Sequence, residues 1–124
     1  MATKSIGKPV KKVEYVIDAA NRAVGRVASE AAHILQGKND VDYVPNLLGK
    51  NTVVIKNVAS VKMTGDQEKK IYYHHTGYMG HLKEMTYKQQ FERDPKTVIE
   101  KAVFNMLPKN RLRQRWMNRL KIEV

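Results

Sequence analysis

Two short runs of β-branched and aromatic residues stand out in the N-terminal half of the chain. Residues 14–18, Glu-Tyr-Val-Ile-Asp, predict a buried strand that ends at Asp18. Residues 52–57, Thr-Val-Val-Ile-Lys-Asn, are too few for a helix and predict a second strand. Between these runs, apolar residues recur at helical spacing from Val24 to Leu35. A strand, a helix and a strand in this order indicate a βαβ unit with a parallel sheet.

The ends of this predicted helix carry residue types that commonly cap helices. Asn21 precedes the first apolar residue of the stripe and is predicted to cap the helix N-terminus. Gly37 follows the last apolar residue, at the place where a helix-terminating glycine is expected.

The C-terminal half shows the same change from strand to helix. Residues 70–75 predict another strand, and residues 87–93 predict a short helix. Asp94 and Pro95 are predicted to start a longer helix, because aspartate is a good cap and proline suits the first helical turn. Pro108 ends that helix.

The last predicted element is a basic helix. Leu112, Trp116 and Leu120 are spaced by four residues, which places them on one helical face, and the remaining positions are largely arginine. We interpret the chain as an α/β protein with a basic helical C-terminus. Residues 1–13 are predicted to be a flexible basic extension, and residues 14–124 to be a single domain.

The 124 residues carry a net charge of +11, and this charge is concentrated in two places. Residues 1–12 hold four lysines and residues 109–121 hold six lysines and arginines, with no acid in either segment, so the two account for +10 of the net charge. Such clusters favour a polyanionic partner, because each cation placed against a phosphate releases condensed counterions. A solvated basic surface kept for solubility is the alternative.

The composition excludes several classes of protein. The chain has no cysteine, which rules out a disulfide framework, a thiolate zinc site and a cysteine nucleophile. Its longest apolar runs are only a few residues, so we expect no membrane-spanning segment. The basic N-terminus lacks the apolar stretch of a secretory signal.

Motifs for nucleotide chemistry are absent. The Gly-Lys pairs at residues 37–38 and 49–50 lack both the earlier glycine and the following Ser or Thr of a phosphate-binding loop. The turn after the first predicted strand lacks the three-glycine dinucleotide fingerprint. We therefore predict no enzymatic activity, no cofactor and no small-molecule substrate.

Two groups of residues could in principle support chemistry. His74 and His75 are adjacent in a predicted strand and point to opposite faces, so no metal site is predicted. A phosphate-dependent enzyme that uses Asp18 and Arg22, at the end of the first strand, stays open as an alternative.

Residues 69–83 carry a pattern suited to structured RNA. The segment interleaves lysines with tyrosines that can stack on bases, histidines that both donate and accept hydrogen bonds, and two glycines that allow close approach of a phosphate. One of the adjacent tyrosines, Tyr72 or Tyr73, is expected to be core, because neighbouring strand residues face opposite ways.

The basic C-terminal helix is the second candidate for RNA binding. Its arginines lie mostly off the apolar stripe, so one face packs on the body while the other meets phosphate. On this view, replacing Arg111, Arg113 and Arg115 by glutamine lowers RNA affinity and leaves thermal unfolding nearly unchanged. A peripheral membrane protein that lies on anionic lipid through this helix is a further alternative.

The chain carries Tyr-Tyr-His-His-Thr-Gly-Tyr-Met-Gly at residues 72–80 and Ala-Val-Phe-Asn-Met-Leu-Pro-Lys-Asn at residues 102–110. Shorter motifs accompany them in order at residues 15–19, 25–29, 35–38, 53–58 and 64–65. This ordered set resembles the large-subunit ribosomal protein family L-thirteen, in its bacterial or organellar form, from about residue 14 to residue 122.

The resemblance implies a three-layer α/β/α domain around a mainly parallel four-stranded sheet. It also implies a structural, non-catalytic role on the ribosome, cytoplasmic or organellar, with binding of large-subunit ribosomal RNA early in assembly. The implied partners are this RNA and neighbouring ribosomal proteins, with no membrane.

The family's motifs carry over with two changes. Residues 75–80 match its His-Ser-Gly-Tyr-Pro-Gly segment, with Thr76 for serine and Met79 for proline, and the loss of proline is expected to loosen the loop. Bacterial members usually continue with a histidine- and proline-containing tail, whereas this sequence ends at Val124, so we expect that contact to be absent or replaced. The residues predicted to contact RNA are Lys11, Lys12, Arg22, Arg26, Lys38, Lys69, Lys70, His74, His75, Gly77, Tyr78, Gly80, Lys83, Lys109, Asn110, Arg111, Arg113, Arg115 and Arg119.

Overall fold

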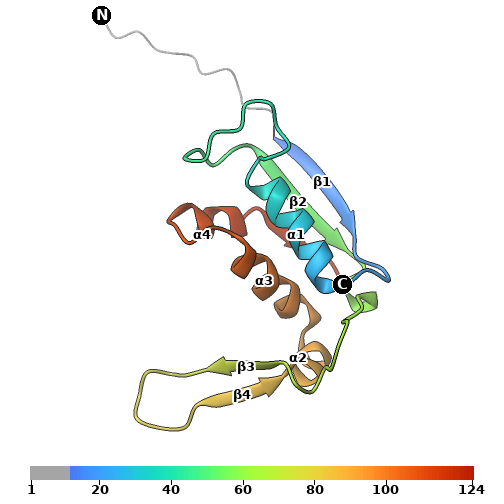
Figure 1. The fold of residues 1–124 in the computed structure, drawn as a ribbon, viewed down its shortest axis with the longest axis vertical. Helices are drawn as coiled ribbons and strands as arrows, with labels where there is room; N and C mark the ends of the chain where they lie inside the picture. The colour runs from blue at the N-terminus through green and yellow to red at the C-terminus, as the bar shows by residue number, and fades with distance from the viewer. Residues whose placement is uncertain (1–11) are drawn as a thin grey trace, which may run out of the picture.

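A parallel strand–helix–strand unit forms the upper part of the molecule in Figure 1, as the sequence predicts for the order of these elements. The computed structural model describes residues 12–124. β1 (Val13–Asp18) and β2 (Asn51–Lys56) are parallel, and α1 (Val24–Leu35) connects them. β5 (Leu120–Ile122) pairs in parallel with the other edge of β2, so the strand order is β1-β2-β5.

The remaining strands form a separate antiparallel hairpin. β3 (Ile71–His74) pairs with β4 (Lys83–Thr86), and this hairpin leads into three helices. The other elements are η1 (Val58–Ser60), α2 (Tyr87–Arg93), α3 (Pro95–Met106) and α4 (Leu112–Met117).

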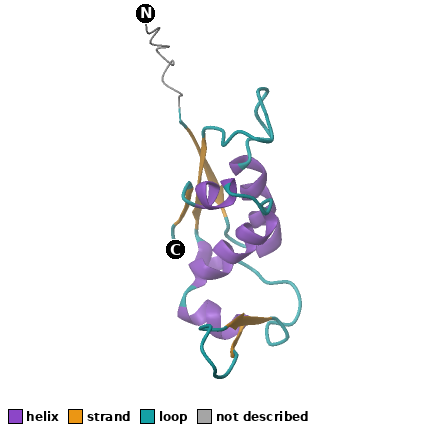
Figure 2. Ribbon diagram, turned by 90° about the vertical axis from the view of Figure 1, so that its left-hand side faces the viewer, coloured by secondary structure: helices purple, strands orange, loops and turns teal. Residues whose placement is uncertain are grey.

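One hydrophobic core joins a single face of the β1-β2-β5 sheet to the helices. Ile17 and Ile55 point from the strands toward alanines of α1 and toward Ile99 and Val103 of α3. Figure 2 shows most of the helical ribbon gathered on one side of these strands. Small alanine side chains at residues 28, 31 and 32 are fully or almost fully buried, which allows α1 to lie close to its neighbours.

The opposite face of this sheet is not covered by the described residues. Val16 is 60% exposed, so the prediction that the first strand is buried is wrong for this face. Val54 is only 4% exposed because it lies in the middle strand, between the side chains of its neighbours. The sheet therefore has three strands and one helical layer, where four strands and three layers were predicted; β3 and β4 pair with each other beside α2 instead.

The start of α1 differs from the prediction that Asn21 caps it. Asn21 has a positive φ of 56° and lies in a turn, where its N–H donates to the carbonyl of Ser60. Asparagine tolerates this left-handed conformation better than most residues. The Val24 N–H donates to the carbonyl of Lys62. The backbone of a neighbouring segment, rather than a capping side chain, therefore accepts the hydrogen bond at the start of the helix. Gly37, with a φ of 77°, ends the helix as predicted.

The junction of α2 and α3 confirms the prediction from local sequence. α2 spans the predicted residues 87–93, and its start is held by a reciprocal capping box between Thr86 and Gln89. Asp94 then accepts a hydrogen bond from the Lys96 N–H, and Pro95 occupies the first position of α3.

The predicted C-terminal helix is shorter than expected. α4 ends at Met117, and Leu120 lies in β5 opposite Val53 rather than on the face of Leu112 and Trp116. The reason is the open edge of β2, whose buried backbone groups need partners that a longer helix would not provide. The Val53 N–H accordingly donates to the Arg119 carbonyl at 3.2 Å.

Trp116 connects α4 to the loop that precedes β2. Its side chain is 2% exposed and belongs to the core cluster, while its indole Nε1–H donates to the Leu48 carbonyl at 3.0 Å. Because tryptophan has a single side-chain donor, this bond satisfies the ring completely and fixes its orientation.

Substituting Trp116→Phe should destabilise the protein by about 1–3 kcal/mol, because the Leu48 carbonyl loses its donor and the smaller ring leaves a void. Urea denaturation followed by circular dichroism measures the change. Gln114→Ala, at an exposed position of the same helix, is the control and should change stability by less than about 0.5 kcal/mol. Equal effects of the two substitutions would contradict the anchoring role of Trp116.

Candidate nucleic-acid interface

Three adjoining hollows run from the β3–β4 hairpin along α3 to the corner between α3 and α4. Their volumes are about 510, 380 and 490 Å³. The first and second share Tyr72, Tyr73 and Lys101 as a wall, and the second and third share Phe104. We call this surface the hairpin–helix groove. Figure 1 shows the hairpin and the α3–α4 corner at the two ends of α3.

The lining of the hairpin–helix groove is mostly cationic. Only two acids, Glu84 and Glu100, accompany the basic residues, and aromatic rings form part of the wall. The Lys101 ammonium lies 4.5 Å from the centre of the Tyr72 ring. The basic residues are Lys83, Arg93, Lys101, Lys109, Arg111 and Arg113.

Neither Tyr72 nor Tyr73 belongs to the buried core, so the prediction that one of them is core is wrong. Tyr73 is 59% exposed, whereas Tyr72 is partly buried, and burial together with the nearby Tyr87 raises the pKa of the Tyr72 phenol. Tyr72 therefore stays neutral at physiological pH and can offer its ring to cations while Tyr73 faces solvent.

The groove contains functional candidates that the sequence analysis missed. Arg93, Lys101 and Phe104 line it, but none of them was predicted to contact RNA. A signal was available for Phe104, because it is a large apolar residue off the buried stripe of α3 and is 39% exposed.

Arg113 is held within the protein and is not a free cation. Its guanidinium donates through Nε to the Phe104 carbonyl at 2.7 Å and stacks on the Phe104 ring at 3.7 Å from the ring centre. The contact joins the end of α3 to α4. From this geometry we expect that replacing Arg113 lowers stability, unlike the expectation from the sequence. Asn110 is also used locally, because its Oδ1 accepts from the Arg113 N–H.

The tip of the hairpin projects aromatic and apolar side chains into solvent. Tyr78 is 82% exposed and Met79 is fully exposed. Gly77 has a φ of 88°, which favours glycine, and its N–H donates to His75 Nδ1 at 3.0 Å. The tip thus presents Tyr78 for stacking from a turn that is partly ordered by His75.

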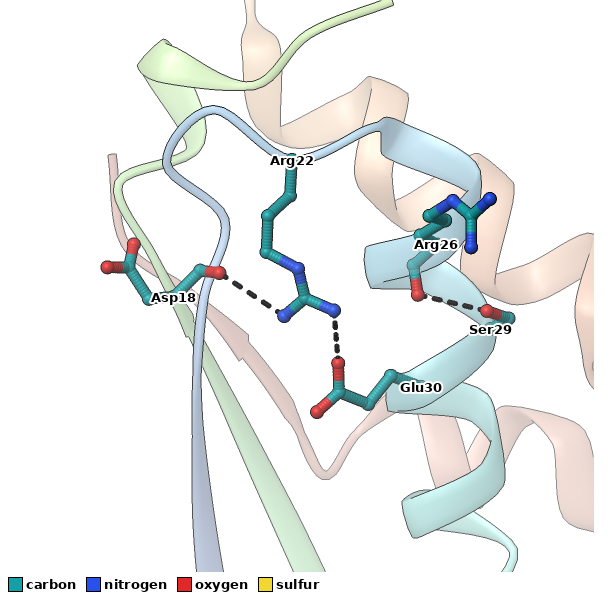
Figure 3. Close-up of polar contacts among 5 residues, drawn as sticks. All are labelled: Asp18, Arg22, Arg26, Ser29 and Glu30. Atoms are coloured by element: carbon teal, nitrogen blue, oxygen red, sulfur yellow. Dashed lines mark hydrogen bonds and ion pairs between the residues drawn. The ribbon is translucent and has the colours of Figure 1, made fainter.

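Arg22 is also paired internally, as Figure 3 shows. Its guanidinium donates to Glu30 at 2.5 Å and to the Asp18 carbonyl at 3.4 Å. Asp18 accepts from the Ala20 N–H and from Asn57 Nδ2, and these hydrogen bonds lower the pKa of the carboxyl group. A phosphate would have to displace Glu30 here, so the geometry does not favour the alternative of a phosphate-dependent enzyme.

The other predicted contact residues are spread over the surface. Arg26 and Lys38 are exposed at opposite ends of α1, Lys69 and Lys70 lie at the base of the hairpin, and Arg115 is exposed on α4. Lys12 and Arg119 lie together elsewhere, beside β1 and β5. His74 and Lys83 line the groove, and Gly80 is at the hairpin tip. Lys11, with most of the predicted N-terminal extension, lies outside the described residues.

The geometry gives no support to the membrane alternative. α4 has only six residues, and its apolar side chains Leu112 and Trp116 pack on the body of the protein. Within residues 12–124, no helix is long and apolar enough to span a bilayer. The same residues contain no cluster of three metal-ligating side chains.

Comparison with known proteins identifies the family. The family described as Ribosomal protein L13 matches residues 12–122. The chain belongs to the ribosomal protein L13 family. A large ribosomal subunit protein uL13 from Thioalkalivibrio sulfidiphilus is 43% identical over 114 residues, which cover 91% of this chain and 80% of that protein. The uL13 protein of Clostridioides difficile is 40% identical, and the match covers 94% of this chain and 84% of that protein. The uL13 protein of Geobacter sulfurreducens is 39% identical, and the match covers 98% of this chain and 87% of that protein.

Membership of the L13 family confirms two predictions made from the sequence. The relatives are structural ribosomal proteins, so this chain is a ribosomal protein and not an enzyme. Its place in the cell is the ribosome.

Substituting Arg113→Gln should destabilise the protein by about 1–2 kcal/mol, because the Phe104 carbonyl and ring lose their cationic partner. Arg111→Gln and Arg115→Gln, at exposed positions of the same segment, serve as controls and should each change stability by less than about 0.5 kcal/mol. Thermal unfolding of the three variants compares them. A stable Arg113→Gln variant would show that the stacked contact is dispensable.

Substituting Asp18→Ala should lower stability at neutral pH and have a smaller effect in acid. The pKa of Asp18 lies below its ordinary value of 3.8 in the folded protein, so its ionised form stabilises the fold above that value. This stabilisation is lost as the pH falls through the folded-state pKa. Urea denaturation at about pH 7 and about pH 3 measures the difference between variant and wild type. A difference that grows in acid would contradict the assignment.

Proposed function

We propose that this protein is a structural component of the large ribosomal subunit that binds the subunit's ribosomal RNA and supports early assembly. The observation that carries the proposal is the hairpin–helix groove, where six cations and several aromatic rings meet two acids. Membership of the L13 family supports the same role. Its other expected partners are neighbouring ribosomal proteins, for which exposed Val41, Val44 and Leu47 offer an apolar surface.

The chemistry of the groove suits folded RNA more than any small ligand. Lys83, Lys109 and Arg111 are exposed and make no ion pair with any described residue, so they can neutralise backbone phosphates without losing a partner. Tyr73 in the groove and Tyr78 at the hairpin tip offer exposed rings on which unpaired bases can stack. Phosphate contacts supply affinity, and the shape of the groove selects the place on the RNA.

The rest of the chain acts as a rigid support for these contacts. One buried cluster contains residues from β1, β2, α1, α3 and α4, which favours the treatment of residues 14–124 as one domain. Val13 already belongs to β1.

Replacing Lys83, Lys109 and Arg111 by glutamine should weaken binding to protein-free large-subunit ribosomal RNA. Log affinity falls as log salt rises, and each lost phosphate contact should make this slope less steep by roughly 0.7–0.9. The slope of the triple variant should therefore be less steep than that of the wild type by up to about 2–3. Filter binding between about 50 and 200 mM salt measures both quantities. Binding without other ribosomal proteins is what an early role in assembly requires.

A variant of Lys62, Lys88 and Lys96 to glutamine is the matched control, because these exposed lysines lie outside the groove and the change in charge is the same. It should retain most of the affinity. If wild-type protein does not bind the RNA, or binds with no dependence on salt, the proposed function is wrong.

A further inference from the structure

Three cations lie directly before the three parallel strands of the central sheet. Lys12 precedes β1, Lys50 precedes β2 and Arg119 precedes β5. Because parallel strands run in the same direction, their amino ends meet at one edge of the sheet. Residues that are far apart in the sequence are therefore brought together by the topology alone.

Backbone hydrogen bonds hold this arrangement in place. The Val13 N–H donates to the Lys50 carbonyl at 3.4 Å, and the Val53 N–H donates to the Arg119 carbonyl at 3.2 Å. These two hydrogen bonds hold the amino ends of the three strands beside one another. They surround a cleft of about 470 Å³ that is lined by Lys12, Gly49, Lys50, Thr52, Asn118, Arg119 and Lys121.

The cleft carries four cations and no carboxylate. None of the four forms an ion pair within residues 12–124. The register places Glu14 opposite Thr52 on the uncovered face of the sheet, but Glu14 does not line the cleft. Four cations this close repel one another, so an anion that neutralises them is favoured electrostatically.

Arg119 is preorganised for this purpose. Its Nη1 donates to the Gly49 carbonyl at 2.6 Å, which fixes the guanidinium beside the cleft. A guanidinium has five N–H donors in a planar fork, so most of them stay available for an anion. Thr52 and Asn118 add a hydroxyl and an amide, which suit phosphate oxygens and ribose hydroxyls.

From this geometry we infer that the amino edge of the β1-β2-β5 sheet is a second RNA-binding site that holds the ribose–phosphate backbone. The inference rests on the proposed function and adds a separate contact to it. The cleft contains no aromatic or large apolar side chain, so it is suited to backbone rather than to stacked bases. The same lack of apolar side chains disfavours a lipid surface, which amphipathic proteins enter with such residues.

The two RNA-binding surfaces are built from different parts of the chain. The hairpin–helix groove uses β3, β4 and helices α2, α3 and α4, whereas the cleft uses residues at or just before the amino ends of β1, β2 and β5. They have no lining residue in common, so each can be removed by substitution while the other is kept.

The test replaces Lys12, Lys50 and Lys121 by glutamine in the full chain and leaves Arg119 in place, because Arg119 also bonds to Gly49. Filter binding to protein-free large-subunit ribosomal RNA should show a loss of affinity of tenfold or more at about 100 mM salt. The salt slope should fall by up to about 2–3. The control variant of Lys62, Lys88 and Lys96 has the same net charge and should bind like wild type.

If the cleft and control variants lose the same affinity for RNA, the loss comes from the lower net charge alone. That result would overturn the inference, while the proposed function would stand. Failure of wild-type protein to bind the RNA would instead overturn the proposed function together with the site that rests on it. Vesicles with anionic phosphatidylserine form a second arm, and a cleft variant that loses vesicle binding but keeps RNA binding would also overturn the inference.

A spectroscopic readout keeps the test independent of the stability of the variant. Titration of isotope-labelled wild-type protein with a short RNA duplex should shift the backbone amide signals of Lys50, Thr52, Asn118 and Lys121. Signals that move only around the hairpin–helix groove would show that the cleft takes no part in RNA binding.

Discussion

The parallel pairing of β2 with β1 on one edge and with β5 on the other is the interaction on which the whole structure depends. It joins segments from the beginning, the middle and the end of the described chain into one sheet. The pairing satisfies the buried backbone of β2, and it aligns Ile17, Val53 and Ile55 on the face that the helices cover. Strand direction also determines which residues meet at each edge. The packing of the core and the position of the charges therefore have the same origin.

Local signals in the sequence predicted the elements whose boundaries are set locally. The short helix α2, the Asp94 cap and the βαβ order were all anticipated, because caps and periodicity act over a few neighbouring residues. The errors concern contacts made over long distances. Leu120 fits the spacing of a helix, but the open edge of β2 draws it into a strand, and Val16 looks like core until the covered face of the sheet is known.

The sequence predicts the positive charge of the candidate interface, but it does not predict which cations are free to bind a partner. Sequence gives the number of cations in a segment, yet it does not say which of them already have partners. Arg22, Arg113 and Arg119 bind Glu30, the Phe104 carbonyl and the Gly49 carbonyl respectively. Conversely, Lys50 and Lys101 were overlooked because each gains its setting from segments that are remote in sequence. The number of cations in a segment therefore does not give the number that can bind a partner.

The position of β5 has a consequence for the order in which the fold can form during synthesis. β1, α1 and β2 emerge from the ribosome first, but one edge of β2 has no strand beside it until residues 120–122 have been made. Until then, a strand rich in valine and isoleucine exposes unpaired backbone groups, which is a template for unwanted pairing with other chains. Trp116 and Arg119, which directly precede β5 in the sequence or lie close to it, bind the loop before β2, and these contacts hold the final strand beside its neighbour.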